Sequence, residues 1–191
     1  MALHRNWSRS RPLSTEGRTE VKRIDDLIDI FLQPGELFVG DKDYQIRTIL
    51  GSCVSITLWH PRSRMGGMSH FLLPTRSTVD AAVGPDGRYG DEALSLMLEE
   101  FQKYGLNPAA CEAKIFGGGN MFPSRQRADT MHVGQRNGEA ARELLLARQI
   151  PVLSESLFGN GHRQIIFDVR TGDVWSRQIE PNRPVAEDEL P

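Results

Sequence analysis

Two short apolar segments joined by a polar turn constrain the middle of the chain more than any other feature. The first is residues 54–59, the second is residues 70–73, and His60-Pro61-Arg62-Ser63-Arg64 lies between them. Polar residues and a proline between two apolar segments are typical of a turn that joins neighbouring strands. Cys53 precedes the first segment and His70 opens the second, so the strand pair would bring a thiol close to an imidazole.

Short strand-like segments recur on both sides of this hairpin. They cover residues 36–40, 46–50, 111–116, 150–157, 162–169 and 173–179. Residues 24–31 fit the spacing of a helix and the alternation of a strand equally well, so their conformation stays open.

Two amphipathic helices are predicted between the strands. In the first, Asp91 caps a segment that Gly105 ends, and its apolar residues recur at helical spacing at Leu94, Met97, Leu98 and Phe101. The second begins near residue 133 and reaches residue 149, with Asn137 as its candidate cap. Consecutive antiparallel strands with two covering helices predict an α+β fold, a layered α/β sandwich of mostly antiparallel strands rather than a doubly wound parallel sheet.

The length favours one domain with loose ends. A chain of 191 residues can bury a core without the help of disulfides. Residues 1–23 are rich in Arg and Ser and are predicted to be a disordered N-terminal extension. Residues 24–180 are predicted to form the single domain, and residues 181–191 an acidic, flexible tail.

Charge and cysteine content exclude several classes of function. Lys and Arg total 23 against 25 Asp and Glu, and this net charge of −2 favours neither nucleic acid nor an anionic membrane. No apolar segment approaches the ~20 residues that span a bilayer, and the N-terminus has no signal-peptide core. Two cysteines in a chain of this size favour a reducing compartment. We therefore expect a cytoplasmic protein without direct membrane insertion.

Cys53 and His70 are the candidate catalytic pair. A neighbouring imidazole takes the proton of a thiol and so generates the thiolate that attacks carbonyl carbons. Gly51 and Ser52 precede Cys53, at a place where free backbone amides would face an oxyanion. The residues alone leave a second interpretation open, in which Cys53 is a small buried hydrophobic side chain. Cys111, in the middle of a predicted strand, is interpreted as a core thiol.

A glycine cluster, Gly117-Gly118-Gly119, follows the strand at residues 111–116. Glycines after a strand let a substrate backbone approach closely or supply amides to an oxyanion. The cluster lacks the lysine of a phosphate-binding P-loop. The chain also lacks CxxC and HExxH patterns, and its histidines are dispersed, so a metal site is not expected.

Several motifs follow one another in a fixed order between about residues 30 and 180. They are Leu50-Gly51-Ser52-Cys53-Val54, Gly66-Gly67-Met68-Ser69-His70-Phe71-Leu72-Leu73-Pro74, Tyr89, Ala113-Lys114-Ile115-Phe116-Gly117-Gly118-Gly119-Asn120-Met121-Phe122, Gly134-Gln135-Arg136-Asn137, Gly159-Asn160-Gly161-His162-Arg163 and Thr171-Gly172. Together they resemble the CheD family of chemoreceptor glutamine deamidases in bacterial chemotaxis. The fold of that family is an α/β sandwich similar to that of the toxin-type cysteine deamidases.

The resemblance implies roles for the residues of the hairpin. Cys53 matches the nucleophile of the family and His70 matches the base. Thr48 is the candidate third catalytic residue, but an ungapped comparison with some members places Arg47 there. A slip of one residue would turn that side chain to the other face of the strand.

The implied reaction is hydrolysis of receptor glutamine side chains to glutamate and ammonia, without a metal or organic cofactor. The Cys53 thiolate attacks, the backbone at Ser52 and Cys53 holds the oxyanion, and His70 protonates the ammonia and activates water against the thioester. Gly118 and Asn120 are predicted to shape the groove that admits a receptor helix. A bulky residue at position 118 is predicted to impair turnover and to leave folding intact.

The implied partners are the cytoplasmic domains of methyl-accepting chemotaxis receptors and the CheC phosphatase, and some family members are credited with receptor methylesterase activity. Two other functions stay open. One is a cysteine amidase or peptidase of other specificity with the same Cys53 and His70 roles; the other is a non-catalytic chemotaxis adaptor that binds receptors or CheC. A His-paired Cys53 is expected to react below the pH at which an ordinary thiol, with a pKa near ~8.5, does.

Overall fold

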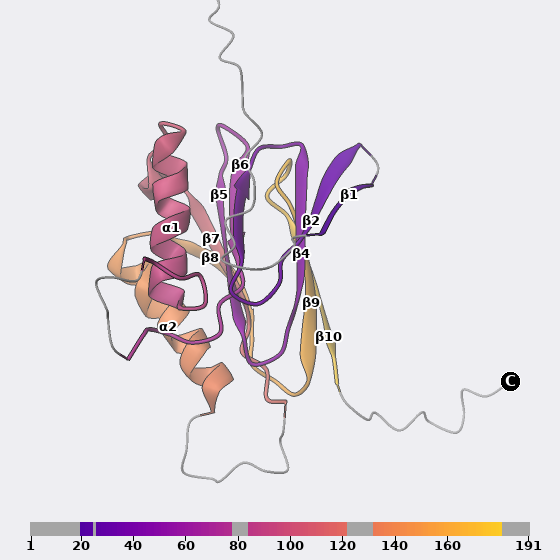
Figure 1. Ribbon diagram of the computed structural model, residues 1–191, viewed down its shortest axis with the longest axis vertical. Helices are drawn as coiled ribbons and strands as arrows, with labels where there is room; N and C mark the ends of the chain where they lie inside the picture. Colours follow the sequence, from indigo (N-terminus) through magenta and orange to yellow (C-terminus); the bar gives the residue numbers. More distant parts are fainter. Residues whose placement is uncertain (1–19, 25, 78–83, 122–131, 181–191) are drawn as a thin grey trace, which may run out of the picture.

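The computed structural model describes residues 20–24, 26–77, 84–121 and 132–180. Within these residues the chain forms two five-stranded sheets and two α-helices, arranged as three layers (Figure 1). The elements in chain order are β1 (Glu20–Ile24), β2 (Leu27–Phe31), β3 (Leu37–Gly40), β4 (Tyr44–Leu50), β5 (Val54–His60), β6 (Met65–Ser69), α1 (Gly90–Lys103), the short 3-10 helix η1 (Pro108–Ala110), β7 (Glu112–Gly117), α2 (Val133–Ala147), β8 (Val152–Leu157), β9 (His162–Asp168) and β10 (Val174–Ile179).

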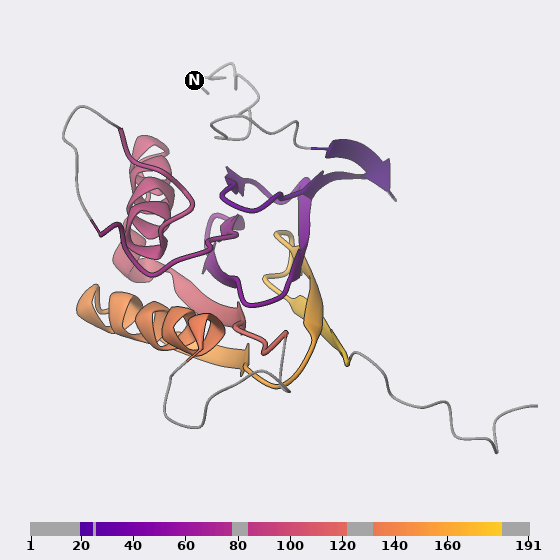
Figure 2. The same ribbon diagram turned by 60° about the horizontal axis from the view of Figure 1, so that its bottom comes forward.

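The two sheets are mostly antiparallel. The outer sheet has the order β1-β2-β4-β9-β10 and the middle sheet the order β3-β6-β5-β7-β8. Among the described strands, β2 pairs with β4 and β7 with β8 in parallel, and the other pairs are antiparallel. Both helices pack on the middle sheet (Figure 2). The predicted α+β sandwich of mostly antiparallel strands with two covering helices is therefore confirmed.

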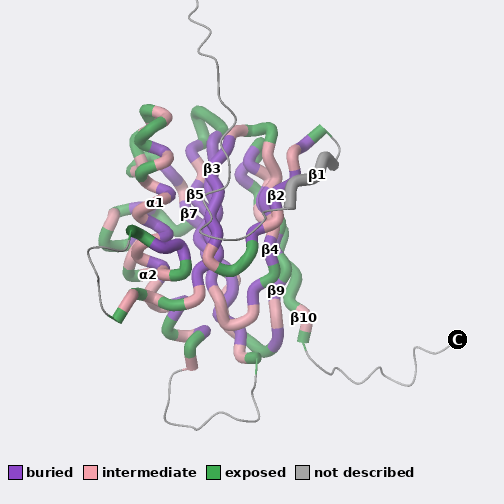
Figure 3. The backbone as a smooth tube through the Cα atoms, in the orientation of Figure 1, coloured by how far each residue is buried: buried purple, intermediate pink, exposed green. Residues whose placement is uncertain are grey.

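Two apolar cores fill the spaces between the three layers. One lies between the helices and the middle sheet, and the other lies between the two sheets. β5 is buried along both faces because its sheet is covered on both sides. β9 and β4 alternate between buried and exposed residues, since the far side of the outer sheet faces solvent (Figure 3). The hairpin that holds Cys53 and His70 thus runs through the best buried part of the fold.

β6 is a strand although two of its five residues are glycine. A Cβ on Gly66 would lie 2.7 Å from the Phe167 ring, and one on Gly67 would lie 2.8 Å from the Val39 side chain. The glycines therefore leave room for Phe167 of the outer sheet and for Val39 of the neighbouring strand β3. The sequence predicted the strand at residues 70–73 instead. In the structure this segment follows β6 and continues its direction through one antiparallel bridge between Val54 and Phe71.

The structure differs from the predicted boundaries in three further places. β1 begins at Glu20 and pairs with β2, so ordered structure starts before the expected position 24. The N-cap of α1 is Tyr89, and Asp91 lies in the first turn. The N-cap of α2 is His132, whose side chain accepts a hydrogen bond from the Gln135 N–H. The rest of the two predicted tails, residues 1–19 and 181–191, lies outside the described residues.

Neither helix of the described part of the chain is long and apolar enough to cross a lipid bilayer.

Candidate active site

Cys53 lies in the turn that carries the chain from β4 in the outer sheet to β5 in the middle sheet. Its side chain is partly exposed and packs at the edge of the core between the sheets. Cys111 is 1% exposed and belongs to the core under the helices. Of these two thiols, Cys53 is the one that a substrate can reach.

Both thiols are protonated at neutral pH. Burial raises the pKa of Cys53, and its own backbone N–H acts in the opposite direction. Burial raises the pKa of Cys111 to about 12. The expectation that Cys53 reacts at unusually low pH is therefore wrong for the free protein, because desolvation outweighs the stabilisation of the thiolate. Cys53 needs a base to become a nucleophile.

The backbone of His70 is fixed by the turn before β3. The His70 N–H donates to the Glu36 carbonyl at 2.9 Å, and the His70 carbonyl accepts from the Gly35 N–H at 2.7 Å. The side chain is 2% exposed. The connection between β2 and β3 therefore fixes the His70 backbone, and the imidazole that it carries is buried.

A chain of hydrogen bonds sets the tautomer of His70. The Thr48 Oγ1–H donates to the Leu32 carbonyl at 2.8 Å, and Thr48 Oγ1 lies 2.8 Å from His70 Nδ1. A hydroxyl has one hydrogen, so Thr48 Oγ1 accepts from the His70 Nδ1–H. Nε2 then carries a free lone pair. It is buried and has no hydrogen-bond partner among the residues described.

His70 is neutral at physiological pH. Burial lowers its pKa to about 4, although a hydrogen bond to the Leu32 carbonyl acts to raise it. A neutral imidazole with a free Nε2 is the form that accepts a proton.

The register across β5 and β6 brings Cys53 and His70 to the same face. Val54 and Phe71 pair antiparallel through two hydrogen bonds of 3.1 and 3.0 Å. Cys53 is then opposite Leu72, and His70 is its diagonal neighbour two residues along. Diagonal neighbours lie about 7–8 Å apart, within reach of an imidazole. The structure thus joins Thr48 to His70 by a hydrogen bond, and the register puts Cys53 on the same face of this strand pair, with no hydrogen bond between Cys53 and His70 among the described residues.

The choice between Thr48 and Arg47 follows from the two faces of β4. Thr48 is 2% exposed and points between the sheets. Arg47 points to the other face, where its guanidinium pairs with Asp29 at 2.7 Å. Thr48, and not Arg47, therefore lies beside His70.

The three carbonyls of the Cys53 turn all accept hydrogen bonds from the glycine segment or from α2. The pairs are Gly119 N–H to Gly51 at 2.8 Å, Asn137 Nδ2–H to Ser52 at 3.0 Å and Gly118 N–H to Cys53 at 2.8 Å. The N–H groups of Ser52 and Cys53 have no acceptor in another residue of the described ranges. Within the described residues, both N–H groups remain available to an anion.

Gly118 lies where the glycine segment packs against the first turn of α2. It is buried with φ +67°, and a Cβ there would lie 2.6 Å from the Gly134 carbonyl in the first turn of α2. The prediction that a bulky residue at 118 leaves folding intact is therefore wrong. Asn120 is half-buried and joins the Gly159–Gly161 turn, with its N–H 2.7 Å from the Gly159 carbonyl and its carbonyl 3.0 Å from the Gly161 N–H.

We expect Gly118→Ala to lower the free energy of unfolding by about 3 kcal/mol or more, because backbone strain and overpacking add. Gly105→Ala is the matched control, with a similar φ of +72° but no described atom within 4 Å of its Cβ position. It should cost about 1 kcal/mol, from strain alone. Urea unfolding measures both. Equal losses would mean that α2 shifts to accommodate the methyl group.

The sequence interpretation missed two buried polar side chains around the turn. Asn137 lies inside α2 and is 0% exposed. The prediction that it caps this helix is therefore wrong. Arg163 is 4% exposed and donates to the carbonyls of Gly117 at 3.0 Å and Phe158 at 3.2 Å. Burial lowers its pKa. A signal existed for Asn137, since it shares the apolar face of its helix with Ala141 and Leu145.

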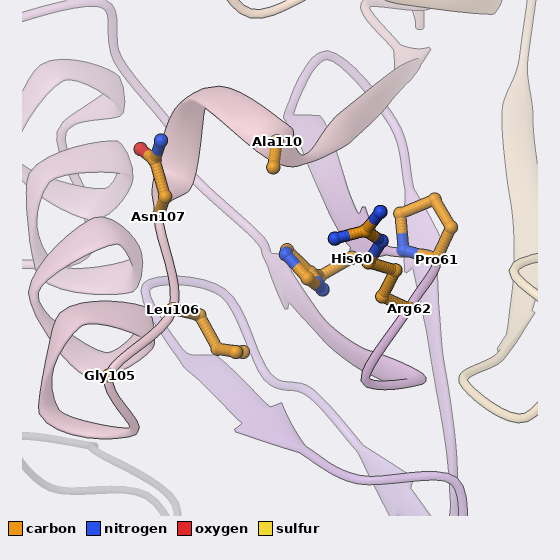
Figure 4. A pocket seen from close by; sticks show the side chains of 7 residues that line it. All are labelled: His60, Pro61, Arg62, Gly105, Leu106, Asn107 and Ala110. Carbon is orange, nitrogen blue, oxygen red and sulfur yellow. The ribbon is translucent and has the colours of Figure 1, made fainter.

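A pocket of about 460 Å³ lies at the other end of β5, between the hairpin turn and the segment after α1 (Figure 4). It is lined by His60, Pro61, Arg62, Gly105, Leu106, Asn107 and Ala110. β5 separates it from Cys53 by roughly 20 Å, so it contains none of the predicted site residues. In the described ranges, no group of three or more His, Cys, Asp or Glu side chains could hold a metal ion.

Fold and site together define an α+β sandwich with a candidate cysteine–histidine site. The CheD family, described as CheD chemotactic sensory transduction, matches residues 72–178, which begin two positions after His70. Curated relatives extend the similarity to about four fifths of the chain. The chain belongs to the CheD family.

Three relatives illustrate this similarity. "Probable chemoreceptor glutamine deamidase CheD 2" of Albidiferax ferrireducens is 66% identical over 81% of this chain and 89% of its own. "CheD 3" of Dechloromonas aromatica is 45% identical over 78% and 87%, and "CheD 1" of Chromobacterium violaceum is 44% identical over 79% and 78%. Among solved structures, the hypothetical protein YfiH of Bacillus licheniformis is 16% identical, covers 63% of this chain and 49% of its own, and gives a TM-score of 0.42.

Proposed function

We propose that this protein is a protein-glutamine glutaminase that deamidates chemotaxis receptors through a Cys53 thioester. The names of its relatives support the reaction and the substrate. The observation that carries the mechanism is the Thr48–His70 hydrogen bond, which leaves His70 Nε2 as a buried base on the face of Cys53.

The first half of the reaction forms the thioester. His70 Nε2 takes the proton of Cys53, and the thiolate attacks the carboxamide carbon of the glutamine. The N–H groups of Ser52 and Cys53 donate to the oxyanion. His70 returns the proton to the nitrogen, the C–N bond breaks, and ammonia leaves.

The second half releases the product. His70 Nε2 takes a proton from water, and the resulting hydroxide attacks the thioester carbon. The C–S bond breaks, the sulfur recovers its proton from His70, and a glutamate side chain remains on the receptor. The reaction consumes one water for each glutamine.

The substrates in this proposal are the cytoplasmic domains of methyl-accepting chemotaxis receptors, and CheC is a second proposed partner. The CheC part rests on the family resemblance. A pull-down of purified CheC with this protein tests it separately from catalysis.

Thr48→Val tests the proposed function at the hydrogen bond that carries it. We expect kcat for receptor deamidation to fall by about 10–10²-fold, because His70 loses the acceptor that fixes its tautomer. Receptor cytoplasmic fragments are incubated with the protein, and mass spectrometry counts the amides converted to acids. Thr57→Val is the matched control, since Thr57 is another buried threonine, bonded to the Lys114 carbonyl at 3.3 Å.

Thr48→Ser should restore most of the rate, since it keeps the hydroxyl. No conversion by the wild-type protein would exclude deamidation of these receptors. Full activity of Thr48→Val would remove Thr48 from the mechanism.

A further inference from the structure

Asn137 links the two halves of the candidate site from inside α2. Its side-chain Nδ2 donates to the Ser52 carbonyl at 3.0 Å and to the Leu72 carbonyl at 2.7 Å. Two carbonyl acceptors identify this atom as the amide nitrogen. The residue is fully buried, and its Oδ1 has no partner among the described residues. An unpartnered buried acceptor lowers stability, so packing alone does not explain this side chain.

The hydrogen bond to Ser52 determines where the next N–H points. The peptide group is planar and trans, so the Ser52 carbonyl and the Cys53 N–H point in opposite directions. Because the carbonyl faces Asn137 in the interior, the Cys53 N–H faces away from α2. It lies near its own sulfur, where it stabilises the thiolate. The free donor is therefore on the side of the nucleophile.

Gly119 acts in the same way on the preceding peptide. Its N–H holds the Gly51 carbonyl at 2.8 Å, which turns the Ser52 N–H away from the glycine segment. Two successive N–H groups thus lack acceptors in the described residues. Each is oriented by a donor that binds the carbonyl at the opposite edge of the same peptide group.

The second hydrogen bond of Asn137 ties the histidine segment to the same amide. Leu72 stands opposite Cys53 and two residues after His70. One side chain therefore sets the distance between the cysteine turn and the strand that carries the base.

We propose that Asn137 is a positioning residue that orients the Cys53 N–H toward the developing oxyanion, with Gly119 orienting the Ser52 N–H. This proposal rests on the proposed function and specifies how its oxyanion site is built. Loss of one oxyanion donor typically costs about 10²–10³-fold in rate. A misdirected donor should cost on the order of 10–10²-fold, in kcat rather than KM, because the oxyanion exists only in the transition state.

Asn137→Leu removes the donor and keeps the branching of the side chain, and Asn137→Ala is a second variant should the first fail to fold. We expect a 10–10²-fold lower kcat for receptor deamidation with little change in KM. Alkylation of Cys53 by iodoacetamide should slow less than deamidation does, since it loses only the stabilisation of the thiolate by this N–H and needs no oxyanion donor. Leu145→Ala, on the same buried face of α2, controls for lost stability and should retain kcat below its unfolding temperature.

A wild-type kcat in both Asn137 variants would overturn the proposal, as would equal losses of deamidation and alkylation. Residual dipolar couplings of the Cys53 N–H test it without turnover. They should change in the Asn137 variants and stay constant in Leu145→Ala. Unchanged couplings would refute the positioning role, whereas an inactive wild-type protein with changed couplings would refute the proposed function alone.

Discussion

Cys53→Ala is expected to abolish deamidation of receptor glutamines, a loss on the order of 10⁴-fold or more. The alanine has no atom that can form the thioester. Cys111→Ala should keep the wild-type rate, because that thiol is buried under the helices with its pKa raised to about 12. Mass spectrometry of receptor fragments gives both rates.

The same experiment tests the covalent intermediate. Acid quenching of the wild-type reaction should trap a receptor peptide on Cys53, and Cys53→Ala should show no adduct. Deamidation that survives in Cys53→Ala would place the nucleophile elsewhere. Loss of activity in a folded Cys111→Ala would contradict the separation of the two thiols. Urea unfolding verifies that both variants are folded.

Alternating patterns predicted most of the strands, since one face of the outer sheet is open to solvent. β6 was missed because its composition, Met-Gly-Gly-Met-Ser, has low intrinsic preference for strands. Its conformation depends on Phe167 and Val39, which occupy the space over Gly66 and Gly67. Such packing between distant segments leaves no local signal.

The helix caps were predicted from local rules that tertiary contacts overrode. Asn137 has the residue type of a cap, but its hydrogen-bond partners lie 85 and 65 residues earlier in the chain. Its place on the apolar face of α2 was the available signal. The hydrogen bonds of Asn137 become apparent only when the fold brings the Cys53 turn next to α2.

The hairpin prediction brought Cys53 and His70 to one region, but it left the choice between Thr48 and Arg47 open until the structure showed which face of β4 each residue occupies. The ionisation of the pair could not be predicted, because it depends on burial. Burial raises the pKa of Cys53 and lowers that of His70. The thiol and the imidazole of the resting site are therefore both neutral and do not form an ion pair.

His70→Gln is expected to lower kcat by about 10²–10⁴-fold, because no group then accepts the proton of Cys53. For the wild-type protein, the rate should fall on the acid side near the His70 pKa of about 4, and not near the ordinary value of 6.5. Above that pH the imidazole is neutral and can act as a base. An acid limb near pH 6.5 would contradict the buried state of His70 in the free enzyme.

The same histidine makes stability depend on pH. The unfolded state binds a proton at about pH 6.5 and the folded state at about pH 4, so protonation between these values favours unfolding. The neutral imidazole thus contributes about 3 kcal/mol to the free energy of unfolding. This contribution is fully present above pH 6.5 and is lost as the pH falls to 4. Urea unfolding between pH 4 and 7 measures this contribution, and His70→Gln should lack it. His60→Gln, at the far end of β5, should retain it, and equal pH dependence in all three proteins would assign the effect to other groups.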